Sequence, residues 1–196
     1  SPRYIGVQHH IAHVLSCIAE NEIALPALGV AWDGTGYGTD GTIWGGEFFL
    51  VTGEAVERVA RLRPFRLPGG DAAVKEPRRV ALGLLYELRG DQAFHRTELR
   101  PIAALSDSER ATLKAMLARR LNSPLCSSMG RLFDAVASLA GLRQETRFEG
   151  QAAMELEFAL EGTKTDAAYD FPLLPRCSPL VLDWSPMVES ILNDCR

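Results

Sequence analysis

The chain has 196 residues, carries a net charge of −4, and is 46% hydrophobic and 23% charged. Such a composition is ordinary for a globular protein with one sizeable core or two small lobes. The acidic balance argues against a broad electrostatic surface for nucleic acid. No apolar run approaches the roughly 18 residues of a membrane-spanning helix, and no signal peptide is visible. We therefore expect neither nucleic acid nor a membrane as a partner.

The cysteines indicate a reducing compartment. Cys17, Cys126, Cys177 and Cys195 are widely separated and form no Cys-x-x-Cys pair. A zinc ribbon or a disulfide scaffold is therefore not expected, whereas a cytoplasmic location is. The sequence lacks an initiator methionine, and its last helical pattern has no stop signal. We expect the sequence to be a segment of a longer chain.

The first predicted elements are a strand over residues 4–7 and a helix over residues 11–21. At about 100° per residue, four apolar side chains share the predicted core face of this helix: Ile11, Val14, Leu15 and Ile18. If the helix already includes His9, then His9 and His13 project to the opposite face and His10 lies on the flank.

Three of the chain's four histidines lie within five residues, from His9 to His13. Two imidazoles four positions apart on a helix can bind one metal ion, and the alternative is that both are simply solvated. A histidine satisfied within the core fits His9 and His13 poorly, because both face away from the apolar stripe. The hydrolase motif His-Glu-x-x-His is excluded, since no glutamate follows the first histidine.

Strands are predicted over residues 27–32 and 43–51, and the segment from Asp33 to Gly41 between them is rich in glycine. Glycine permits close backbone approach, so successive N–H groups can converge on an anion. The alternative is a long hairpin turn without a ligand. An EF-hand is excluded because Trp44 stands where the loop needs glutamate, and no Gly-Lys-Ser/Thr closes a P-loop.

A basic stretch, residues 58–66, is predicted to end a strand, and a turn follows at residues 68–71. The next helix opens at residues 75–79 with Pro77 in its first turn. Its apolar face consists of Val80, Leu84 and Leu88. Near its start, three cationic side chains could contact phosphate or could simply be solvated: Lys75, Arg78 and Arg79.

Later helices are predicted over residues 106–121, over a pattern from residue 127 to 137 that Gly141 stops, and over residues 152–161. Ser106 and Glu109 form a capping box for the first of them. The second has an apolar stripe of Met129, Leu132, Phe133 and Val136. On its opposite face Arg131 and Asp134 are expected to form a surface ion pair. A connector over residues 172–179, a strand over residues 180–184 and a last helix complete the pattern.

The order of these motifs is more specific than any one of them. Five segments in this order resemble the hydrogenase maturation carbamoyltransferases of the HypF type: VQHHIAH from Val7, VAWDGTGYG from Val30, WGGEF from Trp44, SMGRLFDAV from Ser128 and EGQAAME from Glu149. The resemblance covers nearly the whole chain. The family's transferase domain is also similar to the tRNA threonylcarbamoyl-transferases and the antibiotic O-carbamoyltransferases.

The resemblance implies an α/β fold of the actin and sugar-kinase (ribonuclease H-like) superfamily, present here in part. Residues 1–66 would form a strand–helix–hairpin segment for metal and phosphate, and residues 67–196 a mainly helical nucleotide-binding segment. In the family, another domain makes carbamoyl-adenylate from carbamoyl phosphate and ATP. The domain resembled here passes the carbamoyl group to the C-terminal cysteine of a HypE-type partner. The resulting thiocarboxamide is later dehydrated to the cyanide ligand of nickel-iron hydrogenase.

The resemblance also implies the metal site. His9 and His13 match the family's metal-binding histidines, and Asp33 matches a carboxylate at the same metal, so these three are the expected metal ligands and catalytic residues. Two imidazoles and one carboxylate suit Fe(II) or Zn(II), with positions left open for substrate. A cation there could polarise the carbamoyl carbonyl and offset the charge of the adenylate phosphate.

A substrate and nucleotide site is implied beside the metal. Asp134 matches a nucleotide-binding acid of the related tRNA enzymes, a residue type that suits ribose hydroxyls, and Gly150 matches a nearby backbone contact. The glycine loop would hold the phosphate or the carbamoyl group. The full set of expected contact residues is Gly34, Thr35, Gly36, Lys75, Arg78, Arg131, Asp134, Glu149 and Gly150.

The sequence also departs from the family. It lacks the upstream acylphosphatase-like, zinc-finger and adenylate-forming domains, a later Gly-Gly-Val-x-x-Asn segment and a final metal-binding aspartate. A complete transferase lobe is therefore not expected. Two interpretations remain: a carbamoyltransferase, or a catalytically incomplete fragment that only binds nucleotide or partner. A third, a zinc hydrolase, rests on the histidine spacing alone.

Overall fold

The structure is a computed structural model that describes residues 5–195. Its helices are α1 (His9–Glu20), α2 (Asp71–Lys75), α3 (Pro77–Arg89), α4 (Arg100–Ala103), α5 (Asp107–Arg119), α6 (Met129–Leu139), α7 (Gln151–Ala159) and α8 (Ser185–Asp194), with a 3-10 helix over Gly90–His95. Its strands are β1 (Ala27–Tyr37), β2 (Ile43–Val51), β3 (Val56–Leu62), β4 (Phe65–Arg66), β5 (Leu125–Cys126), β6 (Leu173–Leu174) and β7 (Leu180–Leu182).

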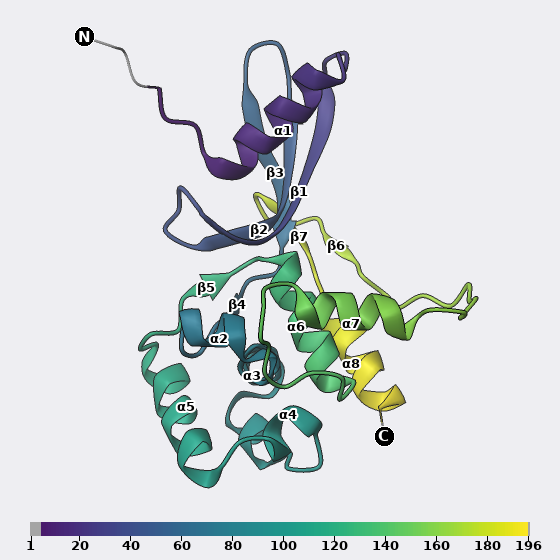
Figure 1. Cartoon of the computed structure of the whole chain (residues 1–196). Helices are drawn as coiled ribbons and strands as arrows, with labels where there is room; N and C mark the ends of the chain where they lie inside the picture. The colour runs from purple at the N-terminus through teal and green to yellow at the C-terminus, as the bar shows by residue number, and fades with distance from the viewer. Residues whose placement is uncertain (1–4, 196) are drawn as a thin grey trace.

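The strands form one sheet with the order β4-β5-β2-β3-β7-β6, and β1 pairs with β2. The long pairs β1–β2 and β2–β3 are antiparallel, whereas β5 and β7 join β2 and β3 in parallel. In Figure 1, α1 lies along these long strands and the later helices gather at the other end of the sheet. The fold is therefore a mixed α/β arrangement. None of the helices described within residues 5–195 is long and apolar enough to cross a membrane.

Local sequence signals explain where several helices begin. Pro77 occupies the first turn of α3, where its missing N–H costs no intrahelical hydrogen bond. The capping box of Ser106 and Glu109 starts α5 as predicted. Ser128 caps α6, since its side chain accepts a hydrogen bond from the backbone N–H of Arg131 at 3.1 Å. These caps satisfy N–H groups that a helix start otherwise leaves unpaired.

Buried apolar residues gather in two clusters within the described part of the chain. The larger lies among α3, α5, α6 and α8 and contains Phe65, Leu84, Leu132 and Trp184. The smaller lies between α1 and the long strands and contains Val14, Ala31, Trp44, Phe49 and Val51. The division of the chain at residue 66 stays a prediction.

Several predicted elements need correction. Residues 5–7 are irregular rather than a strand, and residue 4 of that predicted strand lies outside the described range. Leu15 is 36% exposed because α1 packs mainly against β1 and β2, which cover a stripe along His10 and Val14. Phe133 is exposed, so the apolar stripe of α6 is narrower than predicted. The last predicted strand ends at residue 182.

Cys126 is expected to resist alkylation in the native chain. It is buried between β2 and β4, and burial raises the pKa of its thiol to about 12. Because the thiolate is the reactive form, iodoacetamide at pH 8 should label exposed Cys17, Cys177 and Cys195 but leave Cys126 unmodified until denaturant is added. Mass spectrometry of peptides gives the readout. Native labelling of Cys126 at the same rate as the other three would contradict its burial.

Candidate metal and nucleotide site

Helix α1 presents its histidines at its N-terminal end, beside Asp33 of β1. Gln8 caps the helix by accepting a hydrogen bond from the Ile11 N–H at 3.1 Å, so α1 begins at His9. His9 and His13 are both exposed, and their rings meet edge to face with centroids 4.5 Å apart. His10 is 1% exposed, and burial lowers the pKa of its imidazole while the charge of Asp33 opposes that shift.

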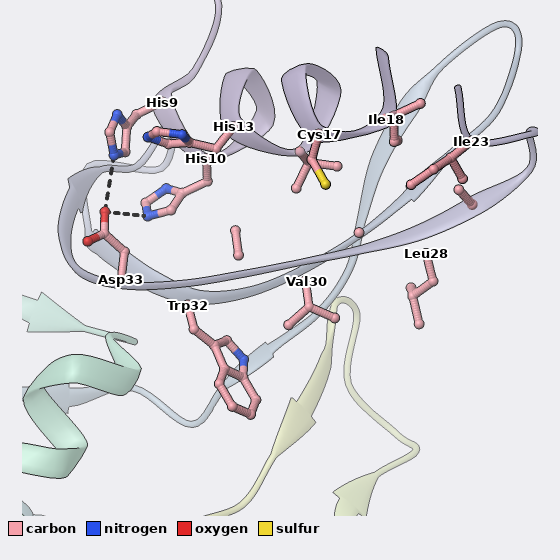
Figure 2. Close-up of a pocket in the computed structure, with 14 residues that line it drawn as sticks. His9, His10, His13, Cys17, Ile18, Ile23, Leu28, Val30, Trp32 and Asp33 are labelled. Carbon is pink, nitrogen blue, oxygen red and sulfur yellow. Dashed lines mark hydrogen bonds and ion pairs between the residues drawn. The ribbon is translucent and has the colours of Figure 1, made fainter. Parts of the chain in front are cut away.

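Asp33 on β1 faces these histidines, as Figure 2 shows. Its Oδ2 lies 3.1 Å from His9 Nε2 and 3.6 Å from His10 Nε2. Its Oδ1 accepts a hydrogen bond from the Gly34 N–H at 2.6 Å. One ligand atom from each of His9, His10 and Asp33 lies within 4.8 Å of the other two. Imidazole nitrogen and carboxylate oxygen are donors that zinc and iron accept, so this group fits a divalent metal.

The position of His13 differs from the expectation that it joins this group directly. Its ring neighbours that of His9 and lines the same pocket, but its ligand atoms are outside the compact group formed by His9, His10 and Asp33. The set His9, His13 and Asp33 as metal ligands therefore stays a prediction. The sequence held a signal for the burial of His10, because His10, Val14 and Ile18 repeat every four positions.

A pocket of about 640 Å³ opens between α1 and the first part of β1. His9, His13 and Asp33 line one end of it, and Cys17 lies one helical turn beyond His13 on α1. Ile18, Ile23 and the strand itself supply apolar walls. The histidines and the carboxylate are thus accessible to a ligand from the pocket.

The glycine-rich segment after Asp33 is not the free loop that was predicted. Strand β1 continues to Tyr37 through an irregularity in its pairing with β2 between Trp32 and Gly36. Glycine is needed here for close approach: a Cβ on Gly36 would come within 2.3 Å of the His10 ring. The positive φ expected of a turn occurs only later, at Gly41. Thr35 is exposed within this strand.

Ser128 ties β1 to the start of α6. Its Oγ lies 2.5 Å from the carbonyl oxygen of Asp33 and 2.8 Å from that of Gly34. Gly130 permits this contact, since a Cβ there would come within 2.8 Å of the Gly34 Cα. A Cβ on Gly34 would in turn lie 3.3 Å from Arg131 Nη2 and 3.5 Å from Glu149 Oε1. The backbone of β1 therefore separates the metal group from a second polar group.

Arg131 and Asp134 form a buried ion pair, so the prediction of a surface pair is wrong. Arg131 Nη1 lies 3.1 Å from Asp134 Oδ2, and their side chains are 4% and 3% exposed. The reason is tertiary: α6 packs against α3, α7 and β1, elements distant from it in the chain or outside its own turn pattern. Burial raises the pKa of the Asp134 carboxyl to about 6, although the Arg131 guanidinium opposes the rise.

This pKa predicts a specific pH dependence for the variant Asp134→Asn. Because the folded-state pKa of about 6 exceeds the ordinary 3.8, the stability from Asp134 is fully present below the unfolded pKa and is lost as pH rises through about 6. A shift of about two units corresponds to about 3 kcal/mol. Between pH 4 and pH 8 the wild type should lose about that much unfolding free energy relative to Asp134→Asn.

Urea denaturation of both proteins at pH 4, 6 and 8 measures the difference. The matched control is Asp170→Asn, which makes the same substitution at an exposed position. A difference between wild type and Asp134→Asn that is the same at all three pH values would contradict the raised pKa.

The remaining residues predicted to contact substrate or nucleotide are Glu149, Gly150, Lys75 and Arg78. Gly150 has φ 76° and caps α7, directly after exposed Glu149. Lys75 is exposed at the end of α2. Arg78 donates hydrogen bonds to Glu76, Glu109 and the Ala104 carbonyl, and it also pairs with Glu145. A phosphate contact by Arg78 stays a prediction, but its guanidinium already has acceptors.

Sequence reasoning missed a supporting group centred on Glu47 of the WGGEF segment. Glu47 is fully buried, and it accepts hydrogen bonds from Arg58 Nε at 2.6 Å and Ser127 Oγ at 2.5 Å. The Arg58 guanidinium also lies 3.9 Å from the centroid of the Trp44 ring. Because Ser127 precedes the serine that contacts Asp33, this group fixes β2 against the start of α6. The available signal was an acidic residue in the middle of a predicted apolar strand, since such a residue needs partners if the strand is buried.

Comparisons with known proteins identify the family of this chain. Residues 29–196 match the family model described as "Carbamoyltransferase, Kae1-like Domain, second subdomain". Carbamoyltransferase HypF of Synechocystis sp. is 41% identical over 97% of this chain and 26% of its own length. The probable carbamoyltransferase HypF of Methanocaldococcus jannaschii is 39% identical over 96% of this chain and 24% of its own.

Two solved structures share the fold. A crystal structure of full-length HypF in the phosphate- and nucleotide-bound form superposes with a TM-score of 0.87 at 38% identity, covering 97% of this chain and 24% of that one. HypF of T. kodakarensis gives a TM-score of 0.81 at 33% identity, covering 95% and 25%.

These matches confirm the predicted superfamily: the α/β fold is that of the actin-like and ribonuclease H-like proteins, as in the HypF structures. The chain spans about a quarter of the length of these two relatives and of both structures. Over residues 29–196, the chain belongs to the HypF carbamoyltransferase family, as the second subdomain of its Kae1-like domain.

Proposed function

We propose that this segment transfers a carbamoyl group from carbamoyl-adenylate to the C-terminal cysteine of a HypE-type partner, a step in making the cyanide ligands of nickel-iron hydrogenase. Family membership supports a carbamoyltransferase, and the relatives carry that name. The reducing compartment that suits the partner thiol and the free cysteines of this chain is the cytoplasm.

One observation carries the proposal: consecutive residues of β1 belong to two different polar groups. Asp33 faces His9 and His10, whereas Gly34 borders Arg131 and Glu149. Adjacent residues of a strand point to opposite faces, so this alternation follows from strand geometry. A metal held by the first group and a nucleotide held by the second would therefore lie on either side of the same two residues, Asp33 and Gly34.

The metal side consists of His9, His13 and Asp33 in the proposal, with iron or zinc as the ion. A bound divalent cation supplies Lewis acidity that polarises the carbamoyl carbonyl and offsets phosphate charge. The chain contributes a carboxylate whose Oδ1 is held by the Gly34 N–H and an exposed imidazole 3.1 Å from Oδ2. The pocket beside α1 leaves these donors open to substrate.

The nucleotide side consists of Arg131, Asp134, Glu149 and Gly150, with the backbone of Gly34 between the two sides. Asp134 Oδ2 is buried, and no residue between 5 and 195 gives it a well-directed hydrogen bond. A carboxylate oxygen with unused capacity can accept a hydrogen bond from a ribose hydroxyl. The phosphate- and nucleotide-bound form of a related HypF is consistent with a nucleotide site in this family.

In the proposed reaction, the partner's thiolate sulfur attacks the carbamoyl carbon and forms the new C–S bond. The bond between that carbon and the phosphate oxygen breaks, and AMP leaves with the electron pair. The Arg131 guanidinium lies within the buried nucleotide side, where a positive charge favours an anionic leaving group.

The test uses the Synechocystis relative, with the substitution corresponding to His13→Ala. Carbamoyl-adenylate formation is measured by release of pyrophosphate, and transfer is measured as the mass added to the partner's C-terminal cysteine. We expect adenylate formation to continue and transfer to cease. Normal modification of the cysteine would remove His13 from the proposed site.

Calorimetric titration of the 196-residue chain with AMP distinguishes a carbamoyltransferase from a segment that only binds nucleotide. Binding that is lost in Asp134→Ala, without turnover by the isolated chain, would favour a binding module for this segment alone. Absence of any heat, together with no protection by AMP against thermal unfolding, would reject the nucleotide site in the chain.

A further inference from the structure

Gln8 occupies a position from which its side-chain amide can be oriented in only one way. Its Oε1 accepts a hydrogen bond from the Ile11 N–H at 3.1 Å, and its Nε2 donates to the Tyr37 carbonyl at 3.1 Å. Exchanging the two ends of the amide would set an NH₂ group against an N–H and an oxygen against a carbonyl. The NH₂ group must therefore be the end that lies 2.9 Å from His10 Nδ1.

This orientation decides the protonation of the His10 ring. An imidazole nitrogen that accepts from an NH₂ group carries no hydrogen, so the neutral ring carries it on Nε2. That Nε2 is buried, makes no hydrogen bond within residues 5–195 and lies 3.6 Å from Asp33 Oδ2. The distance exceeds a normal hydrogen bond, but an N–H facing a carboxylate is attracted, whereas a lone pair there is repelled.

The ring also has little freedom to turn. Gly36 lies against it so closely that a Cβ at that position would come within 2.3 Å of His10 Cε1 and 2.9 Å of Nε2. The ring of Trp44 stands 6.3 Å away between centroids. Strand β1 thus supplies the carbonyl that orients Gln8, the glycine that admits the ring and the carboxylate that the ring faces.

We propose that Gln8 holds His10 in the Nε2–H form and that His10 directs this N–H at Asp33, so that His10 positions the carboxylate and is not itself a metal ligand. This inference rests on the proposed function, because it assigns a role within the same metal site. It also explains why a histidine inside the compact group with His9 and Asp33 need not coordinate: a ligating nitrogen must be free of hydrogen.

With this assignment both oxygens of Asp33 are oriented by the chain. The Gly34 N–H holds Oδ1 at 2.6 Å, and the His10 N–H faces Oδ2. Outer partners of this kind fix the direction of a ligand, and their loss typically costs roughly 10- to 100-fold in metal affinity. His9 and His13 remain as the imidazoles open to the pocket.

The first test is ¹⁵N NMR of the full 196-residue chain with labelled histidine, without metal and with one equivalent of zinc. We expect His10 to show a protonated Nε2 and an unprotonated Nδ1 in both states. In Gln8→Glu a carboxylate oxygen replaces the NH₂ group beside His10 Nδ1, so Nδ1 should gain a hydrogen while Nε2 keeps its own. A protonated Nδ1 in the wild type, a zinc-coordinated His10 Nε2, or an Nδ1 that stays unprotonated in Gln8→Glu would each overturn the proposal.

The second test measures zinc affinity by competition with a chelator for His10→Gln and His10→Leu. A Gln amide can still direct an N–H toward Asp33, so we expect a change below roughly threefold for Gln and a loss of roughly 10- to 100-fold for Leu. Equal losses in both variants would count against a positioning role. If the wild type binds no zinc, the proposed metal site fails, while the tautomer in the metal-free chain still decides how His10 faces Asp33.

Discussion

Replacing Arg131 by methionine is expected to lower the free energy of unfolding by about 3–5 kcal/mol at pH 8. The substitution leaves Asp134, which is 2% exposed, without the guanidinium 3.1 Å away. Removing one partner of a buried pair is costly because an uncompensated charge remains in a poorly solvated position. Urea denaturation at pH 8 measures the loss, which should shrink at pH 5, where Asp134 is largely protonated.

The double variant Arg131→Met with Asp134→Leu should recover most of this loss, since two apolar side chains of similar volume need no compensation. The matched control is Arg143→Met, because Arg143 pairs with Glu155 at the surface of the chain and its loss should matter far less. Equal effects of Arg131→Met and Arg143→Met would contradict the buried pair.

Replacing Asp33 by alanine is expected to reduce zinc affinity by more than roughly 100-fold. This loss is larger than the one caused by removing a residue that only orients a metal ligand. Asp33 contributes the carboxylate of the compact group, and both His9 and His10 face its Oδ2. Zinc binding is measured on the 196-residue chain by competition with a chelator. The corresponding variant of the Synechocystis relative should lose carbamoyl transfer to the same degree.

Glu57→Ala is the control for this experiment, because Glu57 is an exposed carboxylate on strand β3 of the same sheet. The unfolding midpoints of both variants should remain close to that of the wild type, since Asp33 is partly solvated. An Asp33→Ala chain that folds normally and binds zinc as tightly as Glu57→Ala would remove Asp33 from the site.

The helix starts were predictable because their signals act over one turn. Pro77 and the pair Ser106–Glu109 specify their own caps through the backbone next to them. The histidine spacing also implied correctly that His9 and His13 share a face, and their rings are in contact. The predicted buried face of α1 was partly wrong, because Leu15 is exposed and His10 is buried. The position of this face depends on the strands against which α1 packs.

The two sides of the proposed site depend on contacts that no local pattern specifies. The burial of Arg131 and Asp134 requires the packing of α3 and β1 against α6. Composition alone would assign the segment after Asp33 to a turn. It is part of β1 because Gly36 and Tyr37 pair with β2. In each case neighbours distant in the chain overrode the local preference.

The sequence alone specified the family, the order of the elements and the residue types available for chemistry. These types are imidazoles, a carboxylate, glycines that permit close approach and an arginine. The resemblance already implied that Asp33 lies with His9, but only the tertiary structure showed that Asp33 also faces buried His10 and that Gly34 borders Arg131 and Glu149. The physical reason is range. Caps and helical phase arise within about four residues, whereas His9 and Asp33 are 24 positions apart and Ser128 contacts the Asp33 carbonyl across 95.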